Sequence, residues 1–190
     1  MIIKALKRII FLCGTVVLSI GICSCALFED GLKEQKAEVN DVAHLIVNLL
    51  ESGDKKQFKE LFTDEAINTD DFNAGLEYTF KIYSGKLQSM DGTSGHIRDH
   101  YDEVKHTKTA YPYFKIVTTE NVYRLDFDYY LRYKIDFRAS NNEGKIFKFK
   151  LSIIDEANIT DSDYYYNYKS FDRCGIYNPD WDAAVSGHIA

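Results

Sequence analysis

The sequence lacks the motifs of several familiar protein classes. It contains no nucleophile elbow, phosphate-binding loop or Cys-x-x-Cys pair, which mark serine hydrolases, nucleotide-binding proteins and redox or zinc sites. Acidic residues outnumber basic ones by 29 to 23, so there is no basic footprint for nucleic acid or anionic lipid head groups. Only two prolines and 14% aromatic residues are present, which argues against a disordered chain.

The first 25 residues read as the export signal of a bacterial lipoprotein. Three basic residues precede an apolar run over residues 9–22, and residues 22–25 (Ile-Cys-Ser-Cys) have the form of a lipobox. A charged start followed by 7–15 apolar residues and then small residues is typical of a cleaved signal, whereas a bilayer span takes roughly 20. We therefore expect lipid on Cys25 and a location at the cell membrane, on its extracytoplasmic side.

The same segment leaves two alternatives, an uncleaved membrane anchor and plain secretion. Cys23 is a second candidate for the lipid, but the bulky Ile22 before it disfavours cleavage there. Removing residues 1–24 takes away three basic residues and no acidic ones, which leaves 20 against 29 and a net charge of about −9. Only Cys174 then remains without lipid, so we expect no disulfide within the domain and a thiol buried as a small hydrophobe.

The first part of the remaining chain has the periodicity of helices. Between Val39 and Leu50, apolar residues recur at spacings of three and four, which predicts one amphipathic helix. Gly53 suits the end of this helix, and Asp54 suits the cap of the next one. Further helices are predicted over residues 55–62, from residue 63, and over residues 72–83 with Asp70 or Asp71 as the cap.

After Gly85 the periodicity becomes that of strands. Residues 123–137 place apolar side chains at odd positions and mostly charged ones at even positions, which predicts a long antiparallel strand with one buried face, one solvated face and a bulge. Residues 145–153 repeat this pattern after a hairpin-like loop. We expect Phe137 to lie opposite Phe147, which places Asp136 opposite Lys148 on the solvated face.

The other strands are predicted over residues 87–91, 109–119 and 164–171. Residues 92–101 are predicted to form a loop or a strained strand pair, residues 155–163 a loop, and residues 174–181 a closing segment. Pro112 suggests that its strand lies at an edge or starts there. Helices followed by antiparallel strands predict an α+β fold, a curved sheet of about four to six strands wrapped around the N-terminal helices. The predicted organisation is a signal peptide (1–24), a tether (25–34), one domain (35–182) and a tail (183–190).

Three features carry a family resemblance. They are the lipobox at Cys25, the helix junction over residues 52–58 (SGDKKQF), and the phrase over residues 72–92 (FNAGLEYTFKIYSGKLQSMDG). Over roughly residues 38–155 the chain resembles an uncharacterised family of bacterial lipoproteins, domain of unknown function 5104. More broadly it resembles the SnoaL-like or nuclear-transport-factor-like (cystatin-like) superfamily, in which a curved sheet wraps a long helix into a cone. The resemblance implies a fold and a location, not a reaction.

Aromatic residues provide the candidate ligand site. Tyrosines at the mouth of a cone present an apolar ring and a polar hydroxyl to a ligand, and the alternative for each is packing in the core. The candidates are Tyr78, Tyr83, Tyr113 and Tyr129.

Two polar groups are weaker candidates. Three histidines (His96, His100 and His106) lie near Asp99, Asp102 and Glu103, but on a strand the first two would stand roughly 13 Å apart, so we expect solvated side chains rather than a metal site. In pocket enzymes of the resembled superfamily a carboxylate inside the cone acts as a general base. The alternation around Asp126 and Asp128 instead favours the outer face, so no catalytic residue, metal or cofactor is assigned.

The sequence therefore predicts a lipid-anchored envelope domain without nucleic-acid partners. Its expected ligand is a small molecule, a peptide or an envelope protein, bound through the open end of the cone. The alternatives are a small-molecule isomerase or hydrolase that uses a buried carboxylate, and an accessory subunit whose fold occupies an interface.

Overall fold

The computed structural model describes residues 31–101, 106–132, 142–154 and 174–177. The chain divides into two units, residues 1–38 and residues 39–190. In the first unit, the described residues 31–38 are helical. The second unit begins with helical residues 39–52, followed by α2 (Lys55–Glu60), α3 (Asp64–Ile67), α4 (Phe72–Ile82), β1 (Leu87–Tyr101), β2 (His106–Thr118), β3 (Val122–Tyr130), β4 (Lys145–Ile153) and β5 (Gly175–Ile176).

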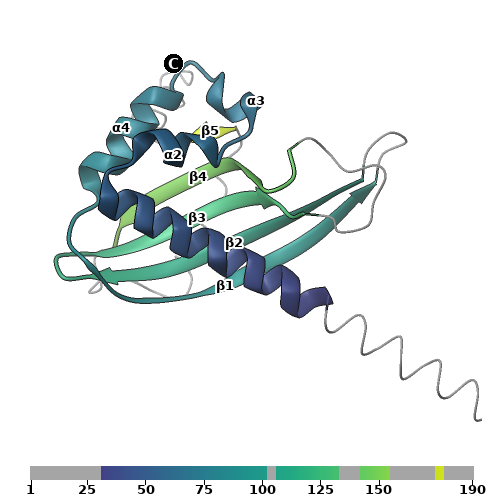
Figure 1. Ribbon diagram of the computed structural model, residues 1–190, viewed down its shortest axis with the longest axis horizontal. Coiled ribbons are helices and arrows are strands. Elements are labelled where there is room, and N and C mark those ends of the chain that lie inside the picture. The colour runs from purple at the N-terminus through teal and green to yellow at the C-terminus, as the bar shows by residue number, and fades with distance from the viewer. Residues whose placement is uncertain (1–30, 102–105, 133–141, 155–173, 178–190) are drawn as a thin grey trace, which may run out of the picture. The chain divides into compact units, whose positions relative to one another are not determined.

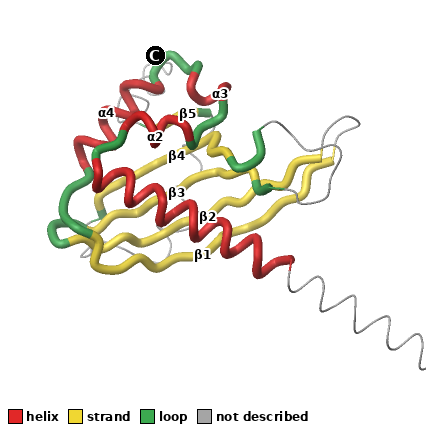
Figure 2. Tube along the Cα trace, in the orientation of Figure 1, coloured by secondary structure: helices red, strands yellow, loops and turns green. Residues whose placement is uncertain are grey.

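The strands of the second unit form one open sheet in the order β1-β2-β3-β4-β5. The first four strands pair antiparallel, and the two-residue β5 pairs parallel to β4. Helical residues 39–52 cross in front of the sheet in Figures 1 and 2, and α2, α3 and α4 gather near β4 and β5. The predicted α+β class, with helices before a mainly antiparallel sheet, is confirmed.

Local capping explains where the helices begin and end. Gly53 adopts a φ of 72°, a left-handed conformation that costs little only for glycine. The Asp54 side chain then caps α2 by accepting a hydrogen bond of 2.9 Å from the backbone nitrogen of Gln57. Thr63 caps α3 in the same way. Asp71 occupies the N-cap position of α4 but makes no side-chain cap hydrogen bond there.

The core lies between these helices and one face of the sheet. Helical residues 39–52 contribute Val39, Ala43, Ile46, Val47 and Leu50 to it. Alternate residues of β3 and the residue after it face them, each at most 1% exposed: Tyr123, Leu125, Phe127, Tyr129 and Leu131. An aromatic cluster of Phe58, Phe62 and Phe149 joins α2 to β4 through ring contacts of 5.3–5.9 Å. The predicted buried face of this strand is therefore confirmed.

The predicted register between the two clearest strands is wrong. Phe149 lies opposite Phe127, and Lys148 lies opposite Asp128 rather than Asp136. The pairing differs from the predicted one by eight residues, because β3 ends at Tyr130 and pairs with β4 over residues 123–130. Residues 133–141 lie outside the described residues. An even shift keeps the same side chains on the buried face, so the alternation of the sequence cannot detect it. The register shifts opposite Asp128 and Tyr129, but the extra residue, Phe147, lies in β4 rather than in the strand for which the bulge is predicted.

Of the two alternatives predicted for residues 92–101, the loop is wrong and the strand pair is present, since β1 runs through this segment and pairs with β2. Gly92 and Gly95 are close-approach positions: an added Cβ would stand 2.4 Å from the Phe114 side chain and 1.7 Å from the Tyr111 carbonyl oxygen, respectively. Gly95 also marks a bulge opposite Tyr111. Glycine here serves strand pairing rather than a loop.

Pro112 lies in β2, an interior strand, so the predicted edge or strand start is wrong. The pairing of β2 with both neighbours skips Pro112, which directly follows the residue opposite the β1 bulge. A proline has no N–H to donate, and a bulge is one of the few places in a sheet that tolerates this. The predicted strand over residues 164–171 and the signal segment lie outside the described residues.

Candidate functional site

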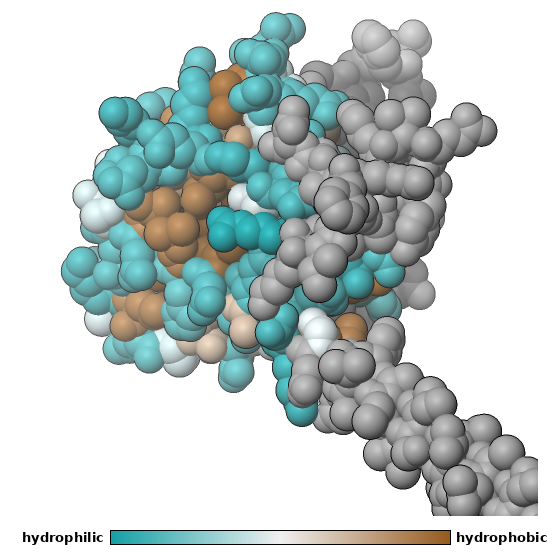
Figure 3. Space-filling model, turned by 45° about the vertical axis from the view of Figure 1, so that its right-hand side comes forward, coloured by the Kyte–Doolittle hydropathy of each residue, from teal (hydrophilic) through white to brown (hydrophobic). Residues whose placement is uncertain are grey.

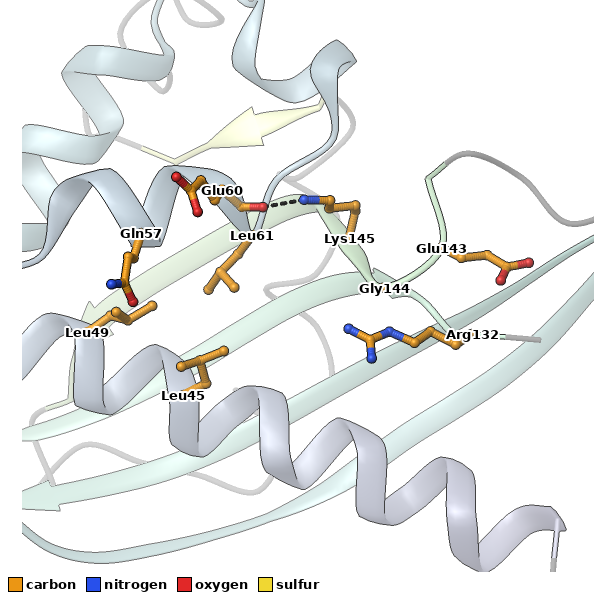
Figure 4. A pocket seen from close by; sticks show the side chains of 9 residues that line it. All are labelled: Leu45, Leu49, Gln57, Glu60, Leu61, Arg132, Glu143, Gly144 and Lys145. Atoms are coloured by element: carbon orange, nitrogen blue, oxygen red, sulfur yellow. Dashed lines mark hydrogen bonds between the residues drawn. The ribbon is translucent and has the colours of Figure 1, made fainter. Parts of the chain in front are cut away.

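A pocket of about 340 Å³ lies between helical residues 39–52, α2 and the chain that enters β4 (Figure 4). This volume is at the lower end of the range of small-molecule sites, roughly 300–1,000 Å³. The lining residues are Leu45, Leu49, Gln57, Glu60, Leu61, Arg132, Glu143, Gly144 and Lys145.

One wall of the pocket is apolar and is built by Leu45, Leu49 and Leu61. Leu45 is 41% exposed, and among the described residues the other exposed large apolar side chain is Ile153, at 55%. Figure 3 shows apolar side chains gathered between hydrophilic ones on the side of the molecule that carries the helices. Leu45 therefore leaves apolar surface exposed instead of completing the core.

The turn at Gly53 and the start of β4 hold this wall in place. The left-handed residue at Gly53 lets α2 follow directly after the first helix. At the other end of α2, the Leu61 carbonyl oxygen accepts a hydrogen bond of 2.8 Å from the backbone nitrogen of Ile146. The pocket thus has a short helix on one side that is fixed at both ends.

The opposite wall is polar and is organised by Gly144. Its φ of 74° is left-handed, and an added Cβ would stand 2.5 Å from the Nε atom of Arg132. The missing side chain therefore leaves the room in which the Arg132 guanidinium lies. In Figure 4 that guanidinium points into the space between Leu45 and Lys145.

The other charged groups of the lining do not face the space between the leucines and Arg132. The Lys145 ammonium donates a hydrogen bond to the backbone carbonyl oxygen of Glu60. The carboxylates of Glu60 and Glu143 point away from the space between the leucines and Arg132 (Figure 4). The cation that faces this space is therefore Arg132.

A second polar cluster lies on the opposite face of the sheet, where the even positions of β3 stand. The Arg124 guanidinium donates to both Asp126 carboxylate oxygens at 2.8–3.0 Å. The Lys148 ammonium stands 3.7 Å from the Asp128 carboxylate. Asp128 is only 3% exposed, so the prediction of a fully solvated face is wrong. Burial raises the pKa of Asp126, and the hydrogen bonds from Arg124 oppose that effect.

Comparison with known proteins identifies the family. The model of a family described as a domain of unknown function, DUF5104, matches residues 45–145, just over half of the 190 residues. The chain belongs to this family. No curated protein and no solved structure matches it. All nine residues that line the pocket lie within the matched part of the chain.

The DUF5104 domain does not bring the four candidate tyrosines together. Tyr129 is 1% exposed within the core, and Tyr83, 9% exposed, stacks on Tyr123 with ring centroids 5.3 Å apart. Tyr78 is half-buried on α4. Tyr113 lies opposite Asp126, with the Arg124 guanidinium 5.6 Å from its ring. None of the four lines the pocket of Figure 4, and ligand binding at these tyrosines stays a prediction.

The histidine-rich segment lies on the hairpin of β1 and β2. Asp99 pairs with Lys108 across the strands at 3.5 Å, and residues 102–105 lie outside the described residues. Within the part of the chain that the structure describes, no group of three or more His, Cys, Asp or Glu side chains is placed to hold a metal ion. In the same part, no helix has the length and apolar content that a membrane span needs.

Cys174 is half-buried at the start of β5. Burial and the nearby Glu65 raise its pKa to about 11. Because the thiolate is the nucleophilic form, this thiol is poorly reactive at neutral pH. The position agrees with the predicted role of a small packed side chain.

Sequence reasoning missed the pocket, although one signal was present. Leu45 falls outside the apolar stripe of its own helix, which is formed by Val39, Val42, Ala43, Ile46, Leu49 and Leu50. An apolar residue beyond the stripe was a sign of exposed apolar surface. Arg132 gave no such signal, because only the fold brings it to this helix.

Proposed function

We propose that the chain is a membrane-anchored envelope lipoprotein whose DUF5104 domain binds a ligand in the pocket of Figure 4. The observation that carries the proposal is the apolar wall of Leu45, Leu49 and Leu61 beside the Arg132 guanidinium. An apolar wall with few convergent polar groups is the common form of a small-molecule site. Leu49 belongs to the core and Leu61 packs against it, whereas Leu45 and Arg132 are exposed and do not complete the core.

The lipobox at Cys25 supports the location. A basic start, an apolar run and small residues before a cysteine favour export and lipidation over a retained anchor. The net charge of about −9 after removal of residues 1–24 keeps the domain from adhering to an anionic membrane surface through charge alone. The proposal also includes the likeness to the SnoaL-like, cystatin-like superfamily, in which a sheet wraps a helix and leaves an open end.

The pocket is tested by thermal denaturation of the full chain in its own membranes, with fractions of a cell-envelope extract added. A ligand that binds the folded state raises the melting temperature by mass action. We expect one fraction to stabilise the wild type and the Ile153→Gln variant but not Leu45→Gln. The two substitutions remove similar exposed apolar side chains, so the pair separates the pocket from general hydrophobicity. Equal stabilisation of both variants would exclude this pocket.

One observation favours an isomerase or hydrolase instead. A carboxyl whose pKa is raised by burial is a candidate general acid or base, and Asp126 is such a group. Its two oxygens, however, accept hydrogen bonds from Arg124, and it does not line the pocket of Figure 4. We therefore propose a binding domain in preference to an enzyme. Catalytic turnover that is lost in an Asp126→Asn variant would favour the enzyme instead.

A further inference from the structure

The pocket has two unlike halves, and each half selects a different part of a ligand. Leu45 and Leu49 come from helical residues 39–52, Leu61 directly follows α2, and the three form an apolar wall. Such a wall favours a hydrocarbon chain, since removing each CH₂ group from water stabilises the bound state. A purely polar ligand would leave this surface without a partner.

Arg132 selects the other end of the ligand. Its guanidinium points into the space between Leu45 and Lys145 (Figure 4), while Lys145 is engaged with the Glu60 backbone. A guanidinium carries five N–H donors, so it can bind a carboxylate in bidentate fashion and keep its contacts within the protein. The ligand should therefore carry an oxyanion next to its apolar part.

The surroundings favour an anion with a single charge. Glu60 and Glu143 also line the pocket, and the chain has a net charge of −6. A phosphate monoester carries up to two negative charges near neutral pH, so it meets about twice the repulsion of a carboxylate. The lining thus offers a ligand one guanidinium that faces the pocket, and a single carboxylate matches its charge.

The tether argues for a ligand that comes from the membrane. Cys25 precedes Leu45 by 20 residues. Even a fully extended chain of that length spans at most about 70 Å, and this is an upper limit because residues 31–45 are helical. A lipid on Cys25 would hold the pocket within that distance of the bilayer, where single-chain amphiphiles are concentrated.

We propose that the pocket binds a single-chain fatty carboxylate, with the alkyl chain on Leu45, Leu49 and Leu61 and the carboxylate on Arg132. This rests on the proposed function, because it names the ligand of the same pocket. Gly144 is part of the site, since a side chain there would displace the Arg132 guanidinium.

The experiment is photo-labelling of the full chain in its membranes with a diazirine derivative of decanoic acid. The matched diazirine alcohol serves as the uncharged probe. Labelled tryptic peptides are identified by mass spectrometry, and the peptides of interest span residues 37–55 and 60–81, which contain the three leucines. Unlabelled decanoate and decyl phosphate are the competitors, and the melting temperature of every variant verifies its fold.

We expect saturable acid labelling of these peptides, with decanoate competing better than decyl phosphate. Arg132→Gln should weaken acid labelling about tenfold or more, because a hydrogen-bonded charge contributes roughly 1.5–3 kcal/mol. Leu45→Gln should weaken labelling by both probes. The controls Arg98→Gln and Ile153→Gln, which change an exposed arginine and an exposed apolar residue elsewhere, should label like the wild type.

Two outcomes would overturn the inference in different ways. If both probes label the pocket equally and Arg132→Gln changes neither, the carboxylate is wrong while the binding pocket stands. If labelling is spread over the chain and is unaffected by Leu45→Gln and Arg132→Gln, this ligand class is excluded. If, in addition, no envelope fraction raises the melting temperature of the wild type, the proposed function is excluded as well.

Discussion

At the scale of single residues, two phenylalanines of one sheet have opposite roles. Phe127 is 1% exposed and lies opposite Phe149 in the core. Phe147 is half-buried at the bulge and stacks on Tyr130 with ring centroids 4.5 Å apart. The alternation of the sequence treats both as members of the same buried set. The register shift opposite Asp128 and Tyr129 separates them.

The first prediction compares these residues. Phe127→Ala should lower the free energy of unfolding by about 3–5 kcal/mol, because it removes a ring from a packed core and leaves a cavity. Phe147→Ala should cost clearly less, since its ring is partly in water already. Urea unfolding of the full chain measures both changes. Equal losses would show that Phe147 is packed as tightly as Phe127, in conflict with its partial exposure at the register shift.

The charged residues of β3 show that alternation in the sequence predicts the face of the sheet but not its exposure to solvent. The pattern places Asp126 and Asp128 on the face away from the helices, and the structure agrees. It also predicts that this face is solvated, yet Asp128 is 3% exposed. Alternation reports which face a side chain is on, whereas coverage of that face depends on the rest of the fold. Both carboxylates are compensated by a cation of the sheet, Arg124 or Lys148.

At the scale of elements, Glu51 joins the end of the first helix to the start of β1. Its carboxylate accepts a hydrogen bond of 2.6 Å from the backbone nitrogen of Leu87 and one of 3.4 Å from the Lys86 ammonium. The bond from Leu87 is the main reason that the pKa of Glu51 lies below its ordinary value. This contact fixes where the sheet begins relative to the helix that carries Leu45 and Leu49.

The second prediction follows from the direction of that shift. A carboxyl with a lowered pKa stabilises the fold above its ordinary pKa of 4.5, and this stabilisation is lost as the pH falls through the folded pKa. Glu51→Gln should therefore lower the stability by about 1 kcal/mol at pH 7, and the gap to the wild type should be smaller at pH 3 than at pH 7. Urea unfolding at both pH values measures the gap.

A control variant for Glu51 is available on α4. Glu77 pairs with Lys55 at 2.5 Å, but its side chain is 67% exposed, and such surface pairs contribute about 0–1 kcal/mol. Glu77→Gln should change the stability less than Glu51→Gln at pH 7. A Glu51→Gln deficit that stays constant from pH 7 to pH 3 would contradict the charged link to β1.

At the scale of the whole molecule, the proposed function joins an export address to a binding domain. The address is Cys25, in the part of the sequence outside the described residues. The domain belongs to the DUF5104 family through residues 45–145. The lipidation signal and the DUF5104 domain lie in different parts of the sequence, so a substitution can abolish membrane anchoring without changing the domain.

The third prediction tests the address. Cys25→Ser should release the chain from the membrane fraction or leave the signal uncleaved, because serine cannot take the thioether-linked lipid. Fractionation and the mass of the N-terminal peptide give the result. Cys23→Ser, two residues earlier, is the matched control and should leave the chain processed and membrane-bound. A processed, membrane-bound Cys25→Ser variant would refute the lipoprotein assignment.

The sequence by itself determined the class and order of the elements. Helical periodicity over residues 39–50, the cap at Asp54 and the alternation over residues 123–131 depend on neighbours in the chain, so they could be read locally. The same holds for the buried face of β3, because its apolar positions repeat every two residues. These features specify an α+β domain before any long-range contact is known.

Only the tertiary structure decided the register of β3 with β4, the course of β1 through Gly92 and Gly95, and the pocket. A shift of eight residues preserves the alternation, and a glycine in a loop looks the same as a glycine under a neighbouring strand. The pocket needs Leu45 and Arg132, which are 87 positions apart in the sequence, on opposite walls. No local pattern encodes such a pairing. Gly53 lets α2 follow directly after the first helix, and Gly144 leaves room for the Arg132 guanidinium next to the two helices.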